Sequence, residues 1–243
     1  MKIKIFVRSL VAILLFLAGV FLELAFSSSV LWGEIETRVY TPKSDSLSLA
    51  VKCPLVLSTN ETGSISTVIS NSLNEEALPV VTASISRNNI PQEISDTLTL
   101  APHASKSIQW HVDTSNLIFD RLILAGISQM SYSDLPGRQG YCSILVLHFL
   151  GLNGTAILIL LCSISMLCII AGGITWLRIH APLKEADTAL AQPFIGLAVL
   201  ATLGVITALL RWWGLIILLD GLTLILAGVI CTEVLLNPQP RRQ

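Results

Sequence analysis

Four long apolar segments constrain this chain more than any other feature of its sequence. They cover residues 9–30, 155–177, 193–210 and 213–236. Each is close to the ~20 residues that a helix needs to cross the ~30 Å hydrocarbon layer of a bilayer. A segment inside lipid must satisfy its own backbone hydrogen bonds, and a helix does so. We therefore expect four transmembrane helices in an integral membrane protein, with bilayer lipid as an immediate partner.

The charged residues are unevenly placed along the chain. Only 13% of the residues are charged and 53% are hydrophobic, whereas a soluble domain has roughly 25% charged residues. Most of the charges lie in the polar segment between the first two apolar segments, which predicts a separate domain over residues 31–152. A net charge of −1 offers no concentrated basic face for phosphates, so nucleic acid is not an expected partner.

The basic residues outside the polar segment predict the orientation in the membrane. They fall in residues 1–8, in the loop 178–192 and in the tail 237–243, and they are Lys2, Lys4, Arg8, Arg178, Lys184, Arg241 and Arg242. Cytoplasmic loops are rich in Lys and Arg, and Trp gathers at membrane interfaces. Arg211, between the last two helices, lies beside Trp212 and Trp213. Both termini are thus expected in the cytoplasm of a multi-pass cell-membrane protein, with the polar domain outside.

The first apolar segment has a second interpretation. Residues 10–22 have the length of the hydrophobic region of a signal peptide, and Ser27, Ser28 and Ser29 supply small residues for cleavage. Cleavage would leave three helices and would keep the polar domain on the same side. Both an uncleaved anchor and a cleaved signal peptide stay open at this point.

Within the polar domain the apolar residues recur with a period of two, which is typical of strands. Ile108, Trp110 and Val112 alternate with polar residues, and residues 47–53 and 81–85 show the same pattern. Further candidate strands are 35–40, 64–70, 94–100, 121–132 and 141–149. Seven or eight short strands in a domain of this size predict an antiparallel, immunoglobulin-like all-β sandwich. The expected fold class is therefore four transmembrane helices plus an extracytoplasmic β-sandwich.

The five cysteines fall into two groups. Cys162, Cys168 and Cys231 lie in apolar segments, where a thiol behaves as a small hydrophobe. Cys53 and Cys142 are the two cysteines of the polar domain, near its beginning and its end. In an oxidising compartment such a pair is a disulfide candidate.

Two acidic residues lie deep within the apolar segments. Glu23 and Asp220 are each expected about eight residues inside the outer end of a helix, and so roughly 12 Å deep. Carboxyls at that depth are costly and are usually paired or functional. They either line a proton or cation path or are held structurally, protonated or bound by Arg211 or by Thr or Ser groups at a helix interface. Four helices without a broken-helix pattern favour the structural role.

Small residues recur along the last two apolar segments. Gly214, Gly221 and Gly228 follow one another every seven residues, and Gly196 and Gly204 stand on the preceding segment. Small residues let helix backbones approach closely in lipid. We expect these glycines to pack the two helices against each other, and a dimer seam is the alternative.

No motif for catalysis or metal binding stands out. The chain has no G-x-S-x-G, H-E-x-x-H, C-x-x-C or P-loop pattern, so neither an enzyme nor a cofactor is expected. A copper site would need a Cys and two His converging at one end of the sandwich. His103, His111, Cys142 and His148 lack that spacing, so no metal site is expected.

Two stretches of the polar domain resemble one family. Residues 97–110, TLTLAPHASKSIQW, resemble the strand, L-x-P-x-x-S, strand signature of CARDB-type bacterial adhesion-related sandwiches. Residues 68–71, VISN, resemble the V-x-N that closes an earlier strand there, although Leu73-Asn74-Glu75 stand where the family has a glycine. The resemblance implies a sandwich that binds or scaffolds rather than one that catalyses.

The expected function is therefore non-enzymatic. The sandwich is expected to bind a protein or an envelope polymer outside the cell, as part of an accessory or scaffold subunit. The alternative is a small transporter or channel subunit that uses Glu23 and Asp220. A membrane enzyme or electron carrier ranks third.

Overall fold

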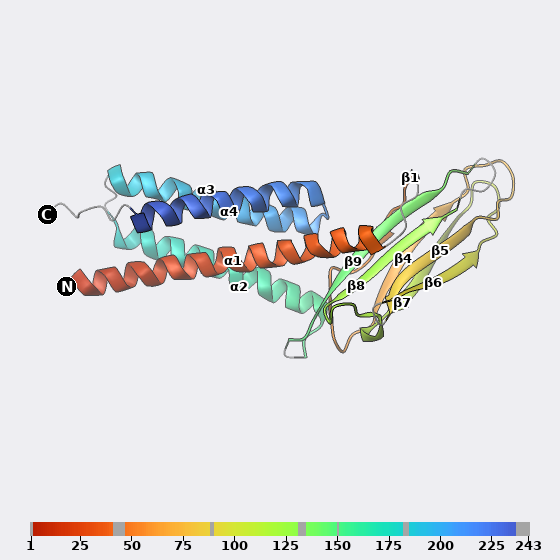
Figure 1. The fold of residues 1–243 in the computed structure, drawn as a ribbon, viewed down its shortest axis with the longest axis horizontal. Coiled ribbons are helices and arrows are strands. Elements are labelled where there is room, and N and C mark those ends of the chain that lie inside the picture. The colour runs from red at the N-terminus through yellow and green to blue at the C-terminus, as the bar shows by residue number, and fades with distance from the viewer. Residues whose placement is uncertain are drawn as a thin grey trace. The chain divides into compact units, whose positions relative to one another are not determined.

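The computed structural model describes residues 2–40, 47–87, 90–130, 135–149, 151–181 and 185–236. The chain divides into two compact units, each drawn in Figure 1. The helical unit comprises residues 1–31 and 159–243, and the sandwich unit comprises residues 32–158. Two helices contribute to both units, because α1 and α2 each cross a boundary between them.

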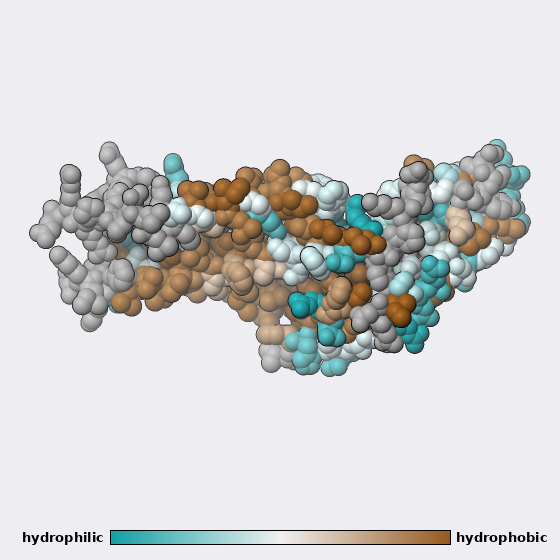
Figure 2. Space-filling view, in the orientation of Figure 1, coloured by the Kyte–Doolittle hydropathy of each residue, from teal (hydrophilic) through white to brown (hydrophobic). Residues whose placement is uncertain are grey.

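Four helices carry the apolar segments. They are α1 (Lys2–Tyr40), α2 (Gly154–Ile179), α3 (Glu185–Leu209) and α4 (Trp213–Leu236). Each contains a stretch that is long and apolar enough to cross a membrane. Figure 2 shows hydrophobic side chains over much of the helical unit, whereas the visible surface of the sandwich unit is largely polar. The four apolar helices expected from the sequence are confirmed.

The first helix is longer than predicted, and its last part corrects the interpretation of residues 35–40 as a strand. These residues are helical, and α1 ends at Tyr40. Buried Gly33, Glu34 and Thr37 recur at helical spacing, and exposed Ile35 and Val39 lie between and beyond them. Extending a formed helix requires no new nucleus. The helix therefore continues through a stretch whose alternation of apolar and polar residues is also typical of a strand.

The third helix begins earlier than predicted. Pro193 was expected at its start, but α3 begins at Glu185 and contains Pro193. Proline is well suited to the first turn of a helix, which is why it was interpreted as the boundary. The preceding sequence, EADTALAQ, is rich in good helix formers. It forms helical turns upstream of Pro193.

Nine strands build the sandwich unit. They are β1 (Leu47–Ser48), β2 (Val51–Lys52), β3 (Val56–Ser58), β4 (Gly63–Ser70), β5 (Val80–Arg87), β6 (Ile90–Thr97), β7 (Ser105–Val112), β8 (Leu122–Gln129) and β9 (Arg138–Leu147). The larger sheet has the order β1-β9-β8-β5-β6, and β3 also pairs with β9. The smaller sheet has the order β2-β4-β7. A short 3₁₀ helix, η1 (Thr114–Asn116), follows β7 and is capped by Asp113.

The two sheets share one hydrophobic core. The larger sheet contributes Val81, Ala83 and Ile127, and the smaller sheet contributes Ile65 and Trp110. Ala83 lies opposite Ile127 across β5 and β8, and Ile65 lies opposite Trp110 across β4 and β7. Because directly opposite residues point to the same face of a sheet, these pairs define the inner faces. The period of two in the sequence therefore predicted correctly which residues of these strands face the core.

The segment 47–53 corrects the interpretation of these residues as a single strand. β1 pairs with β9 in parallel, whereas β2 pairs with β4 antiparallel, so the chain passes from one sheet to the other between them. A Cβ at Gly140 of β9 would collide with the carbonyl oxygen of Leu49 and the side chain of Val51. Glycine at this position is what allows the crossing chain to lie so close. The sandwich is consequently not purely antiparallel, since β3 also pairs with β9 in parallel.

Buried Asn71 fastens the end of β4 to the turn that precedes β7. Its side-chain amide donates to the carbonyl oxygens of Glu75, Leu100 and Ala101, at 2.8, 3.1 and 3.1 Å. Its side-chain oxygen accepts from the backbone amide of Leu73 at 2.9 Å. These contacts join the two stretches that resemble the CARDB signature. The asparagine adds a side-chain donor to the Leu100 and Ala101 carbonyl oxygens, which also accept from the backbone amides of Ala77 and Ala104.

The sandwich unit also holds the first turn of α2. Asn153 caps the helix, with its side-chain oxygen accepting from the backbone amide of Ala156 at 2.8 Å. Glu61, in the loop after β3, accepts from the amides of Gly154 at 2.7 Å and Ser58 at 3.2 Å. A carboxylate at a helix N-terminus satisfies unpaired amides and complements the helix dipole.

Candidate functional site

Asp220 of α4 lies in a cluster of hydroxyl groups inside the helical unit. The Ser27 hydroxyl is 2.9 Å from each carboxyl oxygen of Asp220, and the Ser28 hydroxyl is 3.4 Å from Oδ2. Both serines belong to α1. Asp220 is 7% exposed and Ser27 is 1% exposed. The sequence pointed to Asp220 but not to its partners, because the three serines were interpreted as small residues near a cleavage site.

The number of protons decides what this cluster can do. Ser27 has a single hydroxyl proton, yet its oxygen lies within reach of Asp220 and of the Leu24 carbonyl oxygen, which is 3.1 Å away. If Asp220 is ionised, it accepts the protons of Ser27 and Ser28. If it is protonated, it donates to Ser27, which then donates to Leu24. The serines therefore suit either protonation state, as a structural clamp or a proton relay would require.

A third helix makes room for the carboxyl. A Cβ added at Gly204 of α3 would lie 3.1 Å from Oδ1 of Asp220. Thr207 and Thr223 are also buried, but their hydroxyls bond to backbone carbonyls of their own helices, those of Gly204 and Leu219. The carboxyl thus lies where α1, α3 and α4 meet, and its hydroxyl partners come from α1.

Glu23 lies one helical turn before Ser27 on α1. It is 5% exposed, and its Oε2 atom has no hydrogen-bond partner among the described residues. The hydroxyl of Ser165 on α2 interacts with the carboxyl and also lies 3.0 Å from the Gly19 carbonyl oxygen. The spacing of four residues places Glu23 and Ser27 on one face of α1. That spacing was the sequence signal that could have joined the two carboxyls into one site.

The glycine stripe of α4 does not pack the helices as expected. A Cβ at Gly214, Gly221 or Gly228 would meet no atom within 4 Å. On α3, Gly204 faces Asp220 and Gly196 faces Leu226 at an ordinary contact distance of 3.5 Å. The core of the helical unit instead contains larger side chains of both helices, among them Leu197 of α3 and Ile230 of α4. Seven-residue spacing marks one face of a helix but does not say which neighbour that face meets.

Close backbone approach occurs between α1 and α2. A Cβ at Gly19 would lie 2.7 Å from the Ser165 carbonyl oxygen, and a Cβ at Gly172 would lie 2.6 Å from the Phe16 backbone nitrogen. These two glycines were not singled out from the sequence. A G-x-x-x-G pattern or a regular stripe would have been the signal, and neither residue takes part in one.

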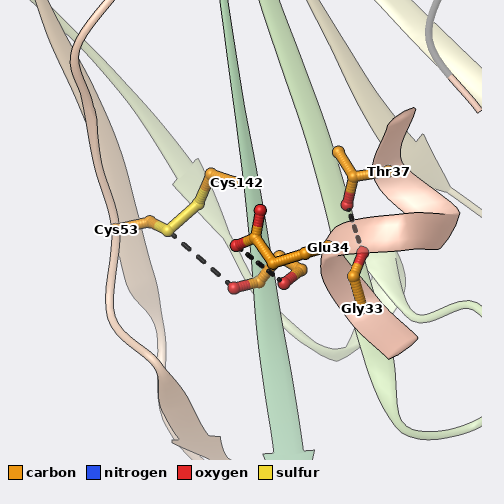
Figure 3. Close-up of a disulfide and its surroundings, with 6 residues drawn as sticks. Gly33, Glu34, Thr37, Cys53 and Cys142 are labelled. Atoms are coloured by element: carbon orange, nitrogen blue, oxygen red, sulfur yellow. Dashed lines mark hydrogen bonds between the residues drawn. A yellow bond between two sulfur atoms is a disulfide. The ribbon is translucent and has the colours of Figure 1, made fainter. Parts of the chain in front are cut away.

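In the sandwich unit a disulfide joins Cys53 and Cys142, as the sequence predicted, with their Cα atoms 6.5 Å apart. Figure 3 shows buried Glu34 beside it, with Oε1 3.4 Å from the Ser143 hydroxyl. The Cys53 sulfur lies 3.9 Å from the Ser143 carbonyl oxygen. This contact is not a hydrogen bond, because a disulfide sulfur carries no proton. A Cβ at Gly33 would lie 2.8 Å from the Ser143 hydroxyl. Glycine therefore lets the end of α1 pack on β9.

Two histidines of the sandwich unit, His103 and His148, have local partners. His103 lies 2.9 Å from the Asn74 side chain, and His148 lies 2.8 Å from the Thr59 hydroxyl. Cys142 is held in the disulfide. Across the described residues, no three or more His, Cys, Asp or Glu side chains lie close enough together to hold a metal ion.

No family model matches this chain, and no curated protein matches it. Among solved structures, the sandwich region is similar to the CARDB domain of a Pyrococcus furiosus protein crystallised with two metal ions. The identity is 12%, the TM-score is 0.33, and the match covers 44% of this chain and 100% of that domain.

Two enzymes share the same kind of partial likeness. Red sea bream transglutaminase is 16% identical with a TM-score of 0.34, over 45% of this chain and 15% of the enzyme. A Bacteroides uniformis β-glucuronidase is 17% identical with a TM-score of 0.29, over 41% of this chain and 13% of the enzyme. The likenesses are confined to less than half of the chain. The resemblance to a CARDB domain is weak and names no activity for this protein.

Proposed function

We propose that this protein is anchored in a membrane by its four helices and presents an immunoglobulin-like sandwich outside the cell, where the sandwich binds a partner protein. Apolar side chains cover the helices, and basic residues gather at residues 1–8, 178–192 and 237–243, as in cytoplasmic segments. A disulfide in the sandwich suits an oxidising compartment. The protein acts in this proposal as an accessory or scaffold subunit and not as an enzyme.

The observation that carries the binding role is an uncovered part of the inner sheet face. Ile94 of β6 lies opposite Ala83 of β5, whose side chain points into the core. All eight residues of β6 are nevertheless exposed, with Ile90 at 68% and Ile94 at 37%. The core face of the larger sheet thus continues onto β6 beyond the cover that the smaller sheet provides. Exposed apolar surface of this kind is typical of interaction sites.

The smaller sheet offers an edge beside this uncovered face. β7 is its last strand, and β4 is the strand paired with it in the described chain. An extended segment of a partner protein that paired with β7 would enlarge the smaller sheet and cover Ile90 and Ile94. Recognition by strand addition gains affinity from backbone hydrogen bonds and specificity from alternate side chains. β6 is itself an edge strand. It carries Pro91, Glu93 and Asp96, which disfavour nonspecific pairing with another strand.

The test is site-specific cross-linking in membranes of the native host. A photoreactive residue at Ile94 should yield one defined cross-linked partner, and the same residue at Val68 should not. Val68 is the matched control because it is 53% exposed and apolar but lies on the smaller sheet, outside the uncovered face. The partner should be lost from co-purification in Ile94→Asp and kept in Val68→Asp. Equal cross-linking from both positions, or none from Ile94, would contradict the binding role.

The orientation is tested separately. Glu93→Cys places a thiol on the exposed strand β6, and a membrane-impermeant maleimide should label it in intact cells. A reporter fused after Gln243 should report the cytoplasm. Protection of the Glu93→Cys thiol until the cells are broken would invert the proposed orientation.

A second candidate function rests on one observation. The buried Oε2 atom of Glu23 has no hydrogen-bond partner in the described chain, and Ser27 lies one turn after Glu23 on α1 and contacts Asp220 of α4. Carboxyls separated by one hydroxyl-bearing turn are an arrangement that a proton path uses. We rank ion movement second, because the serine contacts of Asp220 also explain its burial without transport.

A further inference from the structure

Two adjoining hollows open in the helical unit, apart from the carboxyl cluster. The first, of about 310 Å³, is lined by apolar side chains of α1, α2 and α3, among them Phe16, Trp176 and Phe194. The second, of about 580 Å³, is lined by Arg8, Ile174, Thr175, Arg178 and Ile179. Ile174 lines both, so the two hollows are neighbours at this residue.

Two neighbouring glycines of α2 explain why the apolar hollow exists. Gly172 brings α2 against the backbone of α1, because a Cβ there would lie 2.6 Å from the Phe16 nitrogen. Gly173 also lines the hollow, but a Cβ there would meet no atom within 4 Å. The helices are therefore held together at one glycine and leave space at the next.

Aromatic rings form a firm wall of this space. Phe16 and Phe194 meet edge to face with ring centroids 5.2 Å apart, and Trp176 lies 5.6 Å from Phe194. Trp176 is 7% exposed and Phe16 is 4% exposed. Packed aromatic rings keep their shape, so the hollow is preformed. Its volume is at the lower end of the range for small-molecule sites, ~300–1,000 Å³.

The chemistry of the two hollows differs from one end to the other. Among the residues that the structure describes, the lining of the apolar hollow has no charged side chain, and an apolar space of this kind excludes water and accepts hydrocarbon. Within the same described residues, the lining of the adjoining hollow has two guanidinium groups and no acidic side chain. Guanidinium groups bind phosphate oxygens in a bidentate manner. An occupant with a hydrocarbon chain and an anionic head matches both ends.

We propose that these hollows form a site for one anionic phospholipid, with its phosphate between Arg8 and Arg178 and an acyl chain in the apolar hollow beside Gly173. The site rests on the membrane placement proposed above, which would put both arginines at the cytoplasmic headgroup level. Basic pockets between helices bind anionic headgroups in this way. The bound lipid would join α1 to α2 at the end where both carry an arginine.

The test uses the full chain, purified in a mild detergent and mixed with defined lipids. Native mass spectrometry should show one bound dioleoyl phosphatidylglycerol, with dioleoyl phosphatidylcholine bound much more weakly. Loss of each arginine should weaken binding about fivefold, the effect of ~1 kcal/mol per basic residue near anionic lipid. The variants are Arg8→Gln and Arg178→Gln. Arg121→Gln is the control, because it removes the same charge from the exposed side chain of Arg121 in the sandwich unit.

A second pair of variants tests the chain-binding end. Gly173→Leu should fill the hollow and reduce lipid binding by tenfold or more without disturbing the fold. Gly221→Leu is the matched control, because a Cβ there also meets nothing within 4 Å and Gly221 does not line the hollow. Glycerol phosphate, which has the head but no chain, should not compete.

The outcomes separate this inference from the proposed membrane function. Equal binding of both phospholipids, undiminished binding in Gly173→Leu, or a second copy of the chain in place of the lipid would each overturn the lipid site. If the chain is instead released from membranes by alkaline carbonate, the membrane placement itself fails. A chain that stays in the membrane but binds no phosphatidylglycerol contradicts the lipid site alone.

Discussion

At the scale of single residues, the hydroxyl groups around Asp220 decide how a carboxyl is tolerated among apolar helices. Burying an unpaired polar group costs several kcal/mol, and hydrogen bonds remove most of that cost. Ser27 lies within reach of both carboxyl oxygens, and Ser28 lies within reach of Oδ2. The same geometry suits a neutral amide, which has one acceptor and two donors.

Asp220→Asn separates the structural role from ion movement. Because the amide keeps the size and can still bond to Ser27, we expect a loss of about 1 kcal/mol or less, near the average for polar contacts in lipid. Thermal unfolding in detergent measures this loss, and Ser27→Ala should have a similar effect. Neither the wild type nor Asp220→Asn should move protons or cations in liposomes. Ion flux that depends on Asp220 would instead make transport the first function.

In the sandwich unit, the side chain of Asn71 is expected to stabilise the fold through its hydrogen bonds. Asn71→Ala removes the four side-chain hydrogen bonds of Asn71, whereas the Leu100 and Ala101 carbonyl oxygens keep the backbone amides of Ala77 and Ala104 as donors. Each hydrogen bond contributes about 0.5–1.5 kcal/mol net, and because several are lost together we expect a destabilisation of about 1–3 kcal/mol. Asn74→Ala is the control, because its contact with His103 is exposed. Thermal unfolding of the full chain measures both. Equal melting temperatures for the two variants would show that the side-chain hydrogen bonds of Asn71 do not stabilise the end of β4.

At the scale of elements, the contact between α3 and α4 depends on one small residue. Gly204→Ala would put a methyl group 3.1 Å from Oδ1 of Asp220, so the carboxyl or the helix must shift. We expect a loss of about 1 kcal/mol, the lower end of the range for overpacking a buried site. Gly221→Ala should be neutral or slightly stabilising, because its Cβ enters open space. A comparison of the two melting temperatures tests the assignment, which fails if Gly221→Ala is the more damaging change.

At the scale of the whole molecule, the disulfide closes a long loop. Cys53 and Cys142 are separated by 89 residues, and a cross-link of that span contributes about 2–4 kcal/mol. The double variant Cys53→Ser/Cys142→Ser should lower the melting temperature of the protein under oxidising conditions. Wild type treated with a reductant should fall to the same value. A variant as stable as the oxidised wild type would show that the bond is not needed.

The local features of the molecule could be predicted from the sequence, because they depend on residues close together in the chain. Runs of about twenty apolar residues can satisfy their backbone only as helices in lipid, and Ile108, Trp110 and Val112 alternate because they cover one face of a strand. The pairing of Cys53 with Cys142 followed from their being the two cysteines of the polar domain. Residues 35–40 were interpreted wrongly, since their alternation fits a strand and only the preceding helix makes them helical.

The remaining features depend on which surfaces meet, and only the tertiary structure decides that. Gly204 and the glycine stripe of α4 are alike in sequence, yet Gly204 faces a carboxyl and the stripe meets no neighbour. Ser27 and Asp220 are 193 positions apart, and no local pattern relates them. Ile94 is uncovered because the smaller sheet does not cover β6, and the hollow beside Gly173 exists because α2 contacts α1 at Gly172 and leaves space at the next residue. Helical and strand periods identify a face by residues close in the chain, whereas its partner is set by the packing of residues far apart.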